Sequence, residues 1–195
     1  MKPIIYVRHG STPYDSDVEK IQSWDDSQPV TAAGKRESVR VAQRLSKLPI
    51  AAIVSSHLSR AKTTADAIGK AAGVPVETTD KLAPWKKGKF TGKNVKDVKG
   101  ELDAYQNDKP DEKIPGGESF NDYLGRLKAG VEHVRGLQRA NPDGHVVAVT
   151  HSTDLLALPH IHSAGEEDIP TSGAPKPGSA VTVKTRQGKT SLEPI

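Results

Sequence analysis

The sequence predicts an α/β fold, a doubly wound three-layer sandwich whose mostly parallel central sheet carries helices on both faces. Short apolar runs occur at residues 4–7, 50–54 and 146–149, as is typical of strands buried on both faces. Segments with helical spacing separate these runs along the chain. Because 195 residues suffice to bury a sizeable core, we expect a single domain over residues 1–195.

The first half of the chain is expected to alternate between strands and helices. After the first strand, apolar residues at helical spacing predict a helix that Thr31 caps and Pro49 ends. The second strand leads into another helix, for which Ser59 is the expected cap and Gly73 the expected stop. This order of elements favours parallel strands joined by covering helices.

The second half begins less regularly. Pro, Gly and Lys interrupt the periodicity from residue 80 to 115, and we expect mostly loop there, with one short helix near residues 95–105. A long helix and the third strand follow, and a short apolar helix is expected to start near Thr153. Residues 165–177 are predicted to form an exposed loop, and a β-hairpin around Gln187-Gly188 closes the chain.

Composition narrows the classes of function. The net charge of +4 favours small anionic phosphorylated ligands and falls short of a nucleic-acid signature. The absence of cysteine excludes disulfides, thiol nucleophiles and thiolate metal sites. No apolar run resembles a signal peptide or a membrane span, so we expect a cytoplasmic protein without a membrane partner. Nothing in the sequence indicates an oligomeric state.

Two of the predicted strands end in a histidine. Arg8 and His9 follow the first strand, and His151 follows the third. Arg60 stands at the start of the helix after the second strand, and ligands of open α/β sheets bind beyond the carboxyl ends of strands. A neutral imidazole can attack phosphorus while guanidinium groups and a helix N-terminus hold the phosphoryl oxygens. We therefore expect His9 to be a nucleophile within a phosphate-binding cluster.

Five short motifs strengthen this interpretation. They are RHG with Thr12 at residues 8–12, PVTAAG at 29–34, SSHLSRA at 55–61, PGGES at 115–119 and VAVTHS at 147–152. With these motifs in this order, nearly the whole chain resembles the histidine phosphatase superfamily, also called phosphoglycerate-mutase-like. The resemblance implies the corresponding fold, His9 as the phosphorylated nucleophile, and no cofactor. We expect no metal either, because no acidic or cysteine partner stands at ligand spacing from His160 and His162. It implies phosphate binding by Arg8, Arg60, His151 and Ser152.

The resemblance fails at one important position. Members of the family usually carry a proton-donating glutamate where this chain has Pro84. A positioned general acid typically contributes about a hundred- to ten-thousandfold in rate. Asp154 and Glu118 are the candidate substitutes, followed by three further carboxylates at Asp15, Asp25 and Asp26. Alternatively, the natural leaving group needs no acid, or turnover is slow or lost.

We therefore expect a phosphatase that hydrolyses a small phosphomonoester or related phosphoryl compound through phospho-His9. A phosphoglycerate-mutase-type phosphotransferase and a non-catalytic phosphate-binding module are the alternatives. A basic segment is interpreted either as a solvated face or as a rim that steers anions toward the site. Its lysines are Lys81, Lys86, Lys87, Lys89, Lys93, Lys96 and Lys99.

Overall fold

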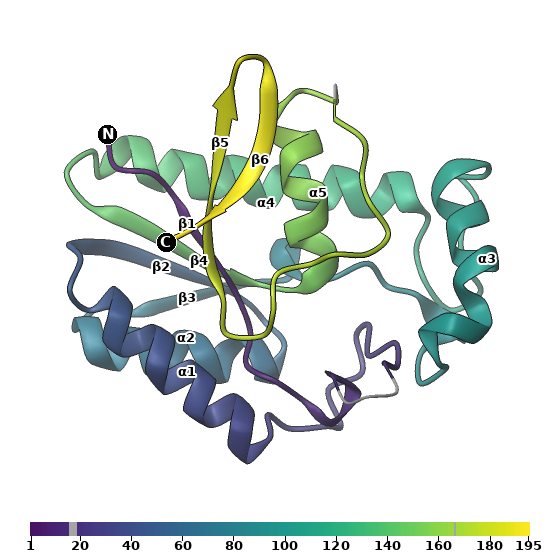
Figure 1. The fold of residues 1–195 in the computed structure, drawn as a ribbon, viewed down its shortest axis with the longest axis horizontal. Coiled ribbons are helices and arrows are strands. Elements are labelled where there is room, and N and C mark those ends of the chain that lie inside the picture. The colour runs from purple at the N-terminus through teal and green to yellow at the C-terminus, as the bar shows by residue number, and fades with distance from the viewer. Residues whose placement is uncertain (16–18, 166) are drawn as a thin grey trace.

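A six-stranded sheet with the order β3-β2-β4-β1-β5-β6 forms the centre of the computed structural model, which describes residues 1–15, 19–165 and 167–195 (Figure 1). The strands are β1 (Ile5–Arg8), β2 (Ile50–Ser56), β3 (Val76–Thr79), β4 (His145–Thr150), β5 (Ala180–Arg186) and β6 (Lys189–Pro194). Strands β1 to β4 pair in parallel, whereas β5 and β6 form the expected hairpin and join β1 antiparallel. The prediction of a mostly parallel sheet is confirmed, and β3 is an additional strand.

Helices cover both faces of the sheet, as predicted. Below it in Figure 1 lie α1 (Ala32–Leu45) and α2 (Ser59–Ala72), and above it lie α4 (Phe120–Ala140) and α5 (Ser152–His162). The remaining helices are α3 (Val95–Asn107), which stands to one side, and 3₁₀ turns at Pro13–Asp15, Asp80–Leu82 and Gly88–Phe90. Among the described residues, no helix combines the length and apolar character that crossing a bilayer requires.

Alternating side chains of the central strands enter two separate cores. Ile5 and Val7 of β1 pack in the core shared with α1 and α2, together with Val149 of β4. Tyr6, between them in sequence, belongs to the core beneath α4 and α5, as does its parallel neighbour Ala148. Since successive side chains of a strand point to opposite faces, apolar residues at every position are explained by burial on both sides.

The helix ends agree with the sequence in part. Thr31 caps α1 by accepting a hydrogen bond of 3.0 Å from the Gly34 N–H, and Gly73 ends α2 in the left-handed conformation at φ 70°. Ser59 was wrongly expected to cap α2. Leu58 occupies the cap position, and the Asp26 carboxylate instead accepts hydrogen bonds from the N–H and hydroxyl of Ser59 at 2.9 Å and 2.6 Å.

Two glycines from the first two motifs fix the loop that follows β1. A Cβ atom on Gly10 would lie 2.3 Å from the Gly34 carbonyl oxygen, and one on Gly34 would lie 2.2 Å from the Ser11 oxygen. Both contacts are with main-chain atoms, which cannot move aside as a flexible side chain would. The chain after β1 therefore lies directly against the start of α1, and this packing positions the neighbouring His9.

Replacing Gly10 with alanine should lower the free energy of unfolding by about 2–3 kcal/mol, because the methyl group overpacks a main-chain contact. Gly100→Ala in α3 is the matched control, since its Cβ would meet no atom within 4 Å. That control should gain about 0.5–1 kcal/mol from helix propensity. Urea denaturation measures both changes, and equal stability of the two variants would contradict the close packing at Gly10.

Candidate active site

A cleft at the carboxyl ends of β1 and β4 brings together residues from distant parts of the chain. Arg8 and His9 line it from the end of β1, Arg60 from the first turn of α2, and His151 and Ser152 from the junction of β4 and α5. Sequence reasoning predicted these five residues for one phosphate-binding cluster, and the fold places all of them around one cavity.

His9 is arranged as a neutral imidazole with one nitrogen available. Its Nδ1 lies 2.9 Å from the Gly10 carbonyl oxygen, and because that oxygen only accepts, Nδ1 carries the hydrogen. The lone pair therefore resides on Nε2. Burial, followed by the charge of Arg60, lowers the pKa of His9 to about 3, so the ring stays unprotonated at neutral pH.

His151 is the second imidazole of the cleft, with its ring centroid 5.0 Å from that of His9. The hydroxyl of Ser56, the last residue of β2, lies 2.8 Å from its Nε2. When that hydroxyl donates to Nε2, Nδ1 carries the hydrogen and can donate to a ligand. Burial and the charge of Arg60 hold the pKa of His151 well below its ordinary value, so both rings are neutral.

Arg8 is held by its two terminal nitrogens. One donates to the Pro175 carbonyl oxygen at 2.8 Å, and the other pairs with the Asp15 carboxylate at 2.5 Å. Asp15 also accepts a hydrogen bond of 2.9 Å from the Thr12 N–H. Asp15 is thus an ion partner that orients the guanidinium of Arg8.

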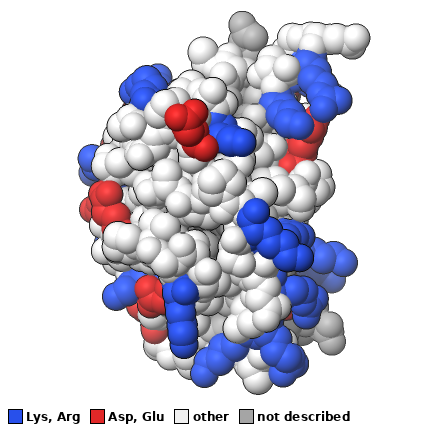
Figure 2. All heavy atoms as spheres, turned by 90° about the vertical axis from the view of Figure 1, so that its left-hand side faces the viewer, with Lys and Arg blue, Asp and Glu red and all other residues white. Residues whose placement is uncertain are grey.

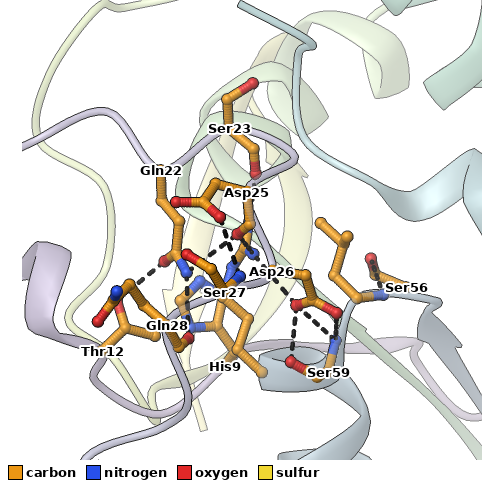
Figure 3. A network of polar contacts seen from close by, with 12 residues as sticks. His9, Thr12, Gln22, Ser23, Asp25, Asp26, Ser27, Gln28, Ser56 and Ser59 are labelled. Atoms are coloured by element: carbon orange, nitrogen blue, oxygen red, sulfur yellow. Dashed lines mark hydrogen bonds and ion pairs between the residues drawn. The ribbon is translucent and has the colours of Figure 1, made fainter. Parts of the chain in front are cut away.

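Arg60 is 2% exposed and anchors the loop that closes the cleft. Its terminal nitrogens donate to the carbonyl oxygens of Ser23 at 2.5 Å and Asp25 at 3.1 Å. Figure 3 shows this loop between His9 and the start of α2, with Asp26 directed at Ser59. Burial lowers the pKa of Arg60 to about 10, which leaves it positively charged at neutral pH.

Four buried side-chain donors of the cleft wall lack a hydrogen-bond partner among the described residues: Arg8 Nε, Arg60 Nε, His151 Nδ1 and the Thr153 hydroxyl. Buried polar groups are nearly always paired, so such a cluster marks a place for an anion with several oxygens. Ser152 and Thr153 add the N-terminus of α5, whose first N–H groups have no side-chain cap in the described chain. The helix start expected to bind phosphate, that of α2, is instead capped by Asp26.

Pro84 lines the cleft, where the family resemblance places the missing glutamate. Its carbonyl oxygen accepts a hydrogen bond of 2.7 Å from Trp24, and its side chain has no proton to give. Glu118 is not brought to the cleft. Its carboxylate accepts hydrogen bonds from Arg126 at 2.6 Å and from the Lys86 N–H at 2.9 Å, and it serves to join α4 to the irregular segment.

Asp154 lies behind the cleft rather than in it. Its side chain is fully buried and accepts hydrogen bonds from Tyr123, at 2.9 Å, and from Thr150. Burial raises its pKa to about 6, but the residue does not line the cavity. Asp25 and Asp26 are also committed elsewhere, to Tyr14 and to the start of α2. None of these three predicted carboxylates is among the residues that line the cleft.

The basic segment does not form a continuous rim. Six of its seven lysines are exposed, and Lys89 and Lys99 pair with Glu101 and Asp103. Lys87 differs, since it is half-buried and lines the cleft. Basic side chains also gather in the lower half of the face drawn in Figure 2. Helix α1 carries the exposed residues Lys35, Arg36, Arg40 and Arg44.

Several cleft residues were not predicted from the sequence. Gln22 and Ser23 belong to the loop before α1, in a part that precedes the motif at 29–34 and has no periodicity. Ser56 contacts His151 without lining the cavity, and it offered one usable signal, because it ends β2, the strand beside β4. Lys87 was noted only as one of a series, and nothing in its spacing separates it from the exposed lysines around it.

Comparison with known proteins adds a family and a fold. A family model described as the histidine phosphatase superfamily (branch 1) matches residues 4–193. The protein named probable phosphoglycerate mutase GpmB of Escherichia coli O1:K1 is 31% identical over 162 residues, which cover 81% of this chain and 73% of that protein.

Solved structures share the whole architecture. A mycobacterial glucosyl-3-phosphoglycerate phosphatase superposes with a TM-score of 0.80 at 24% identity, over 99% of this chain and 97% of the other. The alpha-ribazole phosphatase of Shigella flexneri superposes with a TM-score of 0.74 at 21% identity, over 100% and 96%. At these identities, the likeness shows a common fold.

Proposed function

The chain belongs to the histidine phosphatase superfamily, and on that premise we propose that it hydrolyses a small phosphomonoester through a phosphohistidine intermediate on His9. One observation carries the proposal. A neutral His9, with Nδ1 bound to a carbonyl oxygen, lines the same cleft as four buried donors without partners among the described residues. A nucleophile and an anion site are thereby combined in one cavity.

The reaction has two steps. Arg8, Arg60, His151 and the start of α5 hold the phosphoryl oxygens while His9 Nε2 attacks phosphorus. The Nε2–P bond forms as the bond from phosphorus to the ester oxygen breaks. Water then attacks phosphorus and breaks the Nε2–P bond, which releases phosphate and restores His9. The solved complex of the mycobacterial phosphatase with inorganic phosphate supports a site of this kind.

A second cavity beside the cleft provides space for the organic group of the ester. The two cavities share Trp85, Lys87, Val95 and Thr153 in their walls. Beyond these residues the second cavity is mostly apolar, with Leu102 and other side chains from α3, α4 and α5. An ester bound with its phosphate between the arginines therefore extends its alcohol portion toward α3.

The protein should hydrolyse p-nitrophenyl phosphate at least about 10⁶-fold faster than the uncatalysed reaction, with release of inorganic phosphate and inhibition by vanadate. Assays of phosphate release measure this rate. Binding of phosphate without turnover would contradict the proposal and favour the non-catalytic module.

The name of the E. coli relative supports phosphoglycerate mutase activity as a second candidate function. Transfer of the phosphoryl group between two phosphoglycerates, without net release of phosphate, would identify that activity.

A further inference from the structure

Among the described residues, the cleft wall holds no buried carboxylic acid that is free of partners. Pro84 occupies the usual position of the acid, and Asp15, which also lines the cavity, is held by Arg8 and Thr12. Glu19 is the other described carboxylate in the wall, and it is exposed. An alkoxide leaves poorly without a proton, so hydrolysis of an alkyl phosphate needs another donor.

We propose that Lys87 supplies this proton, from Nζ to the leaving oxygen, and thus replaces the missing glutamate; this inference rests on the proposed phosphatase function. Lys87 lines both the phosphate cleft and the apolar cavity beside it. The bond that is cleaved joins the phosphate to the organic group, so a residue at the junction of the two cavities faces the leaving oxygen.

The main chain holds Lys87 in register with the phosphate site. Its N–H donates to the Ser23 hydroxyl at 2.8 Å, while the carbonyl oxygen of Ser23 accepts a hydrogen bond of 2.5 Å from Arg60. One loop residue therefore connects Lys87 to a phosphate-binding guanidinium. On the other side, Gly88 packs so tightly that a Cβ atom would lie 2.2 Å from the Pro115 carbonyl oxygen. Both neighbours limit movement of the backbone at Lys87.

The surroundings of the ammonium group make it a better acid than an ordinary lysine. Nζ lies 5.6 Å from the centroid of the Trp85 ring, which forms part of both cavities. Burial lowers the pKa of Lys87 to about 8, opposed by the charges of Glu19 and Asp154. Other charged residues in the walls of the two cavities are Arg8, Asp15, Lys20, Arg60, Lys99 and Asp103. At neutral pH the group is protonated and close to the pKa that general acid catalysis favours.

The proton balance closes over the two steps. As the P–O bond breaks, the leaving oxygen takes a proton from Lys87 Nζ, and the alcohol departs from a phosphorylated His9 beside a neutral amine. The amine then takes a proton from the attacking water as the Nε2–P bond breaks. Phosphate leaves, and the ammonium form of Lys87 is restored.

Lys87→Met should lower kcat for glycerol 2-phosphate by about 10²-fold or more and kcat for p-nitrophenyl phosphate by less than about tenfold, because nitrophenolate leaves without a proton. Lys87→Arg should show the same selective loss, since a guanidinium keeps the charge but does not release a proton at these pH values. The matched control is Lys89→Met, whose exposed ammonium pairs with Glu101 and whose loss should alter neither rate.

The pH profile provides a second readout. The wild-type kcat for the alkyl ester should fall on the alkaline side as Lys87 deprotonates, and this limb should be absent in Lys87→Met. Equal slowing of both substrates by Lys87→Met, or full alkyl activity in Lys87→Arg, would overturn the role of Lys87 while leaving the phosphatase function intact. Failure of the wild type to hydrolyse even the aryl ester would overturn the phosphatase function itself, and the inference with it.

Discussion

Replacement of His9 by alanine should lower kcat for p-nitrophenyl phosphate by about 10⁴-fold or more, because it removes the proposed nucleophile of the covalent intermediate. In the variant, water would have to attack the ester directly. It would do so without the imidazole that the hydrogen bond to Gly10 and the close packing at Gly34 hold in place. Steady-state release of nitrophenol and trapping of acid-labile phosphate on the quenched enzyme measure the two consequences.

A control variant separates chemistry from folding. His133→Ala removes a half-buried imidazole that lies outside the cleft and contacts Glu77 at 2.8 Å, and it should leave the rate unchanged. His9→Ala should still bind inorganic phosphate, since the donors of Arg8, Arg60 and His151 remain. Full activity of His9→Ala, or the same labelling by phosphate as in the wild type, would exclude the covalent mechanism.

The same geometry sets the response to acid. Because burial and Arg60 bring the pKa of His9 to about 3, protonation removes the nucleophile only as the pH approaches that value. The rate for an aryl ester should therefore show no loss from His9 near pH 6.5, where an exposed histidine titrates. An acid limb near pH 6.5 that depends on His9 alone, and that remains in variants of the other cleft residues, would contradict this arrangement.

The sheet was predictable because its central strands are buried on both faces, and burial leaves continuous apolar runs in the sequence. Strand β3 was not, because Val76–Thr79 lies at the sheet edge and its middle residues are exposed, which removes the apolar signal. The cap of α2 was misassigned for a related reason. Asp26 caps that helix from another loop, and such a contact leaves no local pattern near Ser59.

The residues of the proposed phosphate site were predictable because strand ends carry them, so topology alone brings Arg8, His9 and His151 together. The proposed proton donor was not. Asp154 and Glu118 stand at plausible distances along the chain, but partners from α4 bind both carboxylates away from the cleft. Position in the sequence places a backbone, whereas the direction of a side chain depends on contacts made elsewhere in the fold.

Loss of the Arg60 guanidinium should have the second-largest effect on catalysis. Arg60→Met is expected to lower kcat/KM for p-nitrophenyl phosphate by about 10²–10³-fold, since a preorganised donor to the phosphoryl oxygens is removed. It should also weaken inhibition by vanadate and lower stability, because the carbonyl oxygens of Ser23 and Asp25 lose their buried donor. Lys62→Met, an exposed change on the same helix, serves as the control.

Arg60→Lys decides whether charge or shape is required at this position. The two terminal nitrogens of Arg60 are already occupied by Ser23 and Asp25, and Nε remains for the phosphate. A lysine ammonium is a single point of charge and cannot bind both carbonyl oxygens and a phosphoryl oxygen in this planar arrangement. We therefore expect Arg60→Lys to lose most of the activity that Arg60→Met loses. A kcat/KM near the wild-type value in Arg60→Lys would show that a positive charge alone suffices at this position. It would also show that the loop from Ser23 to Asp25 keeps its position without the guanidinium.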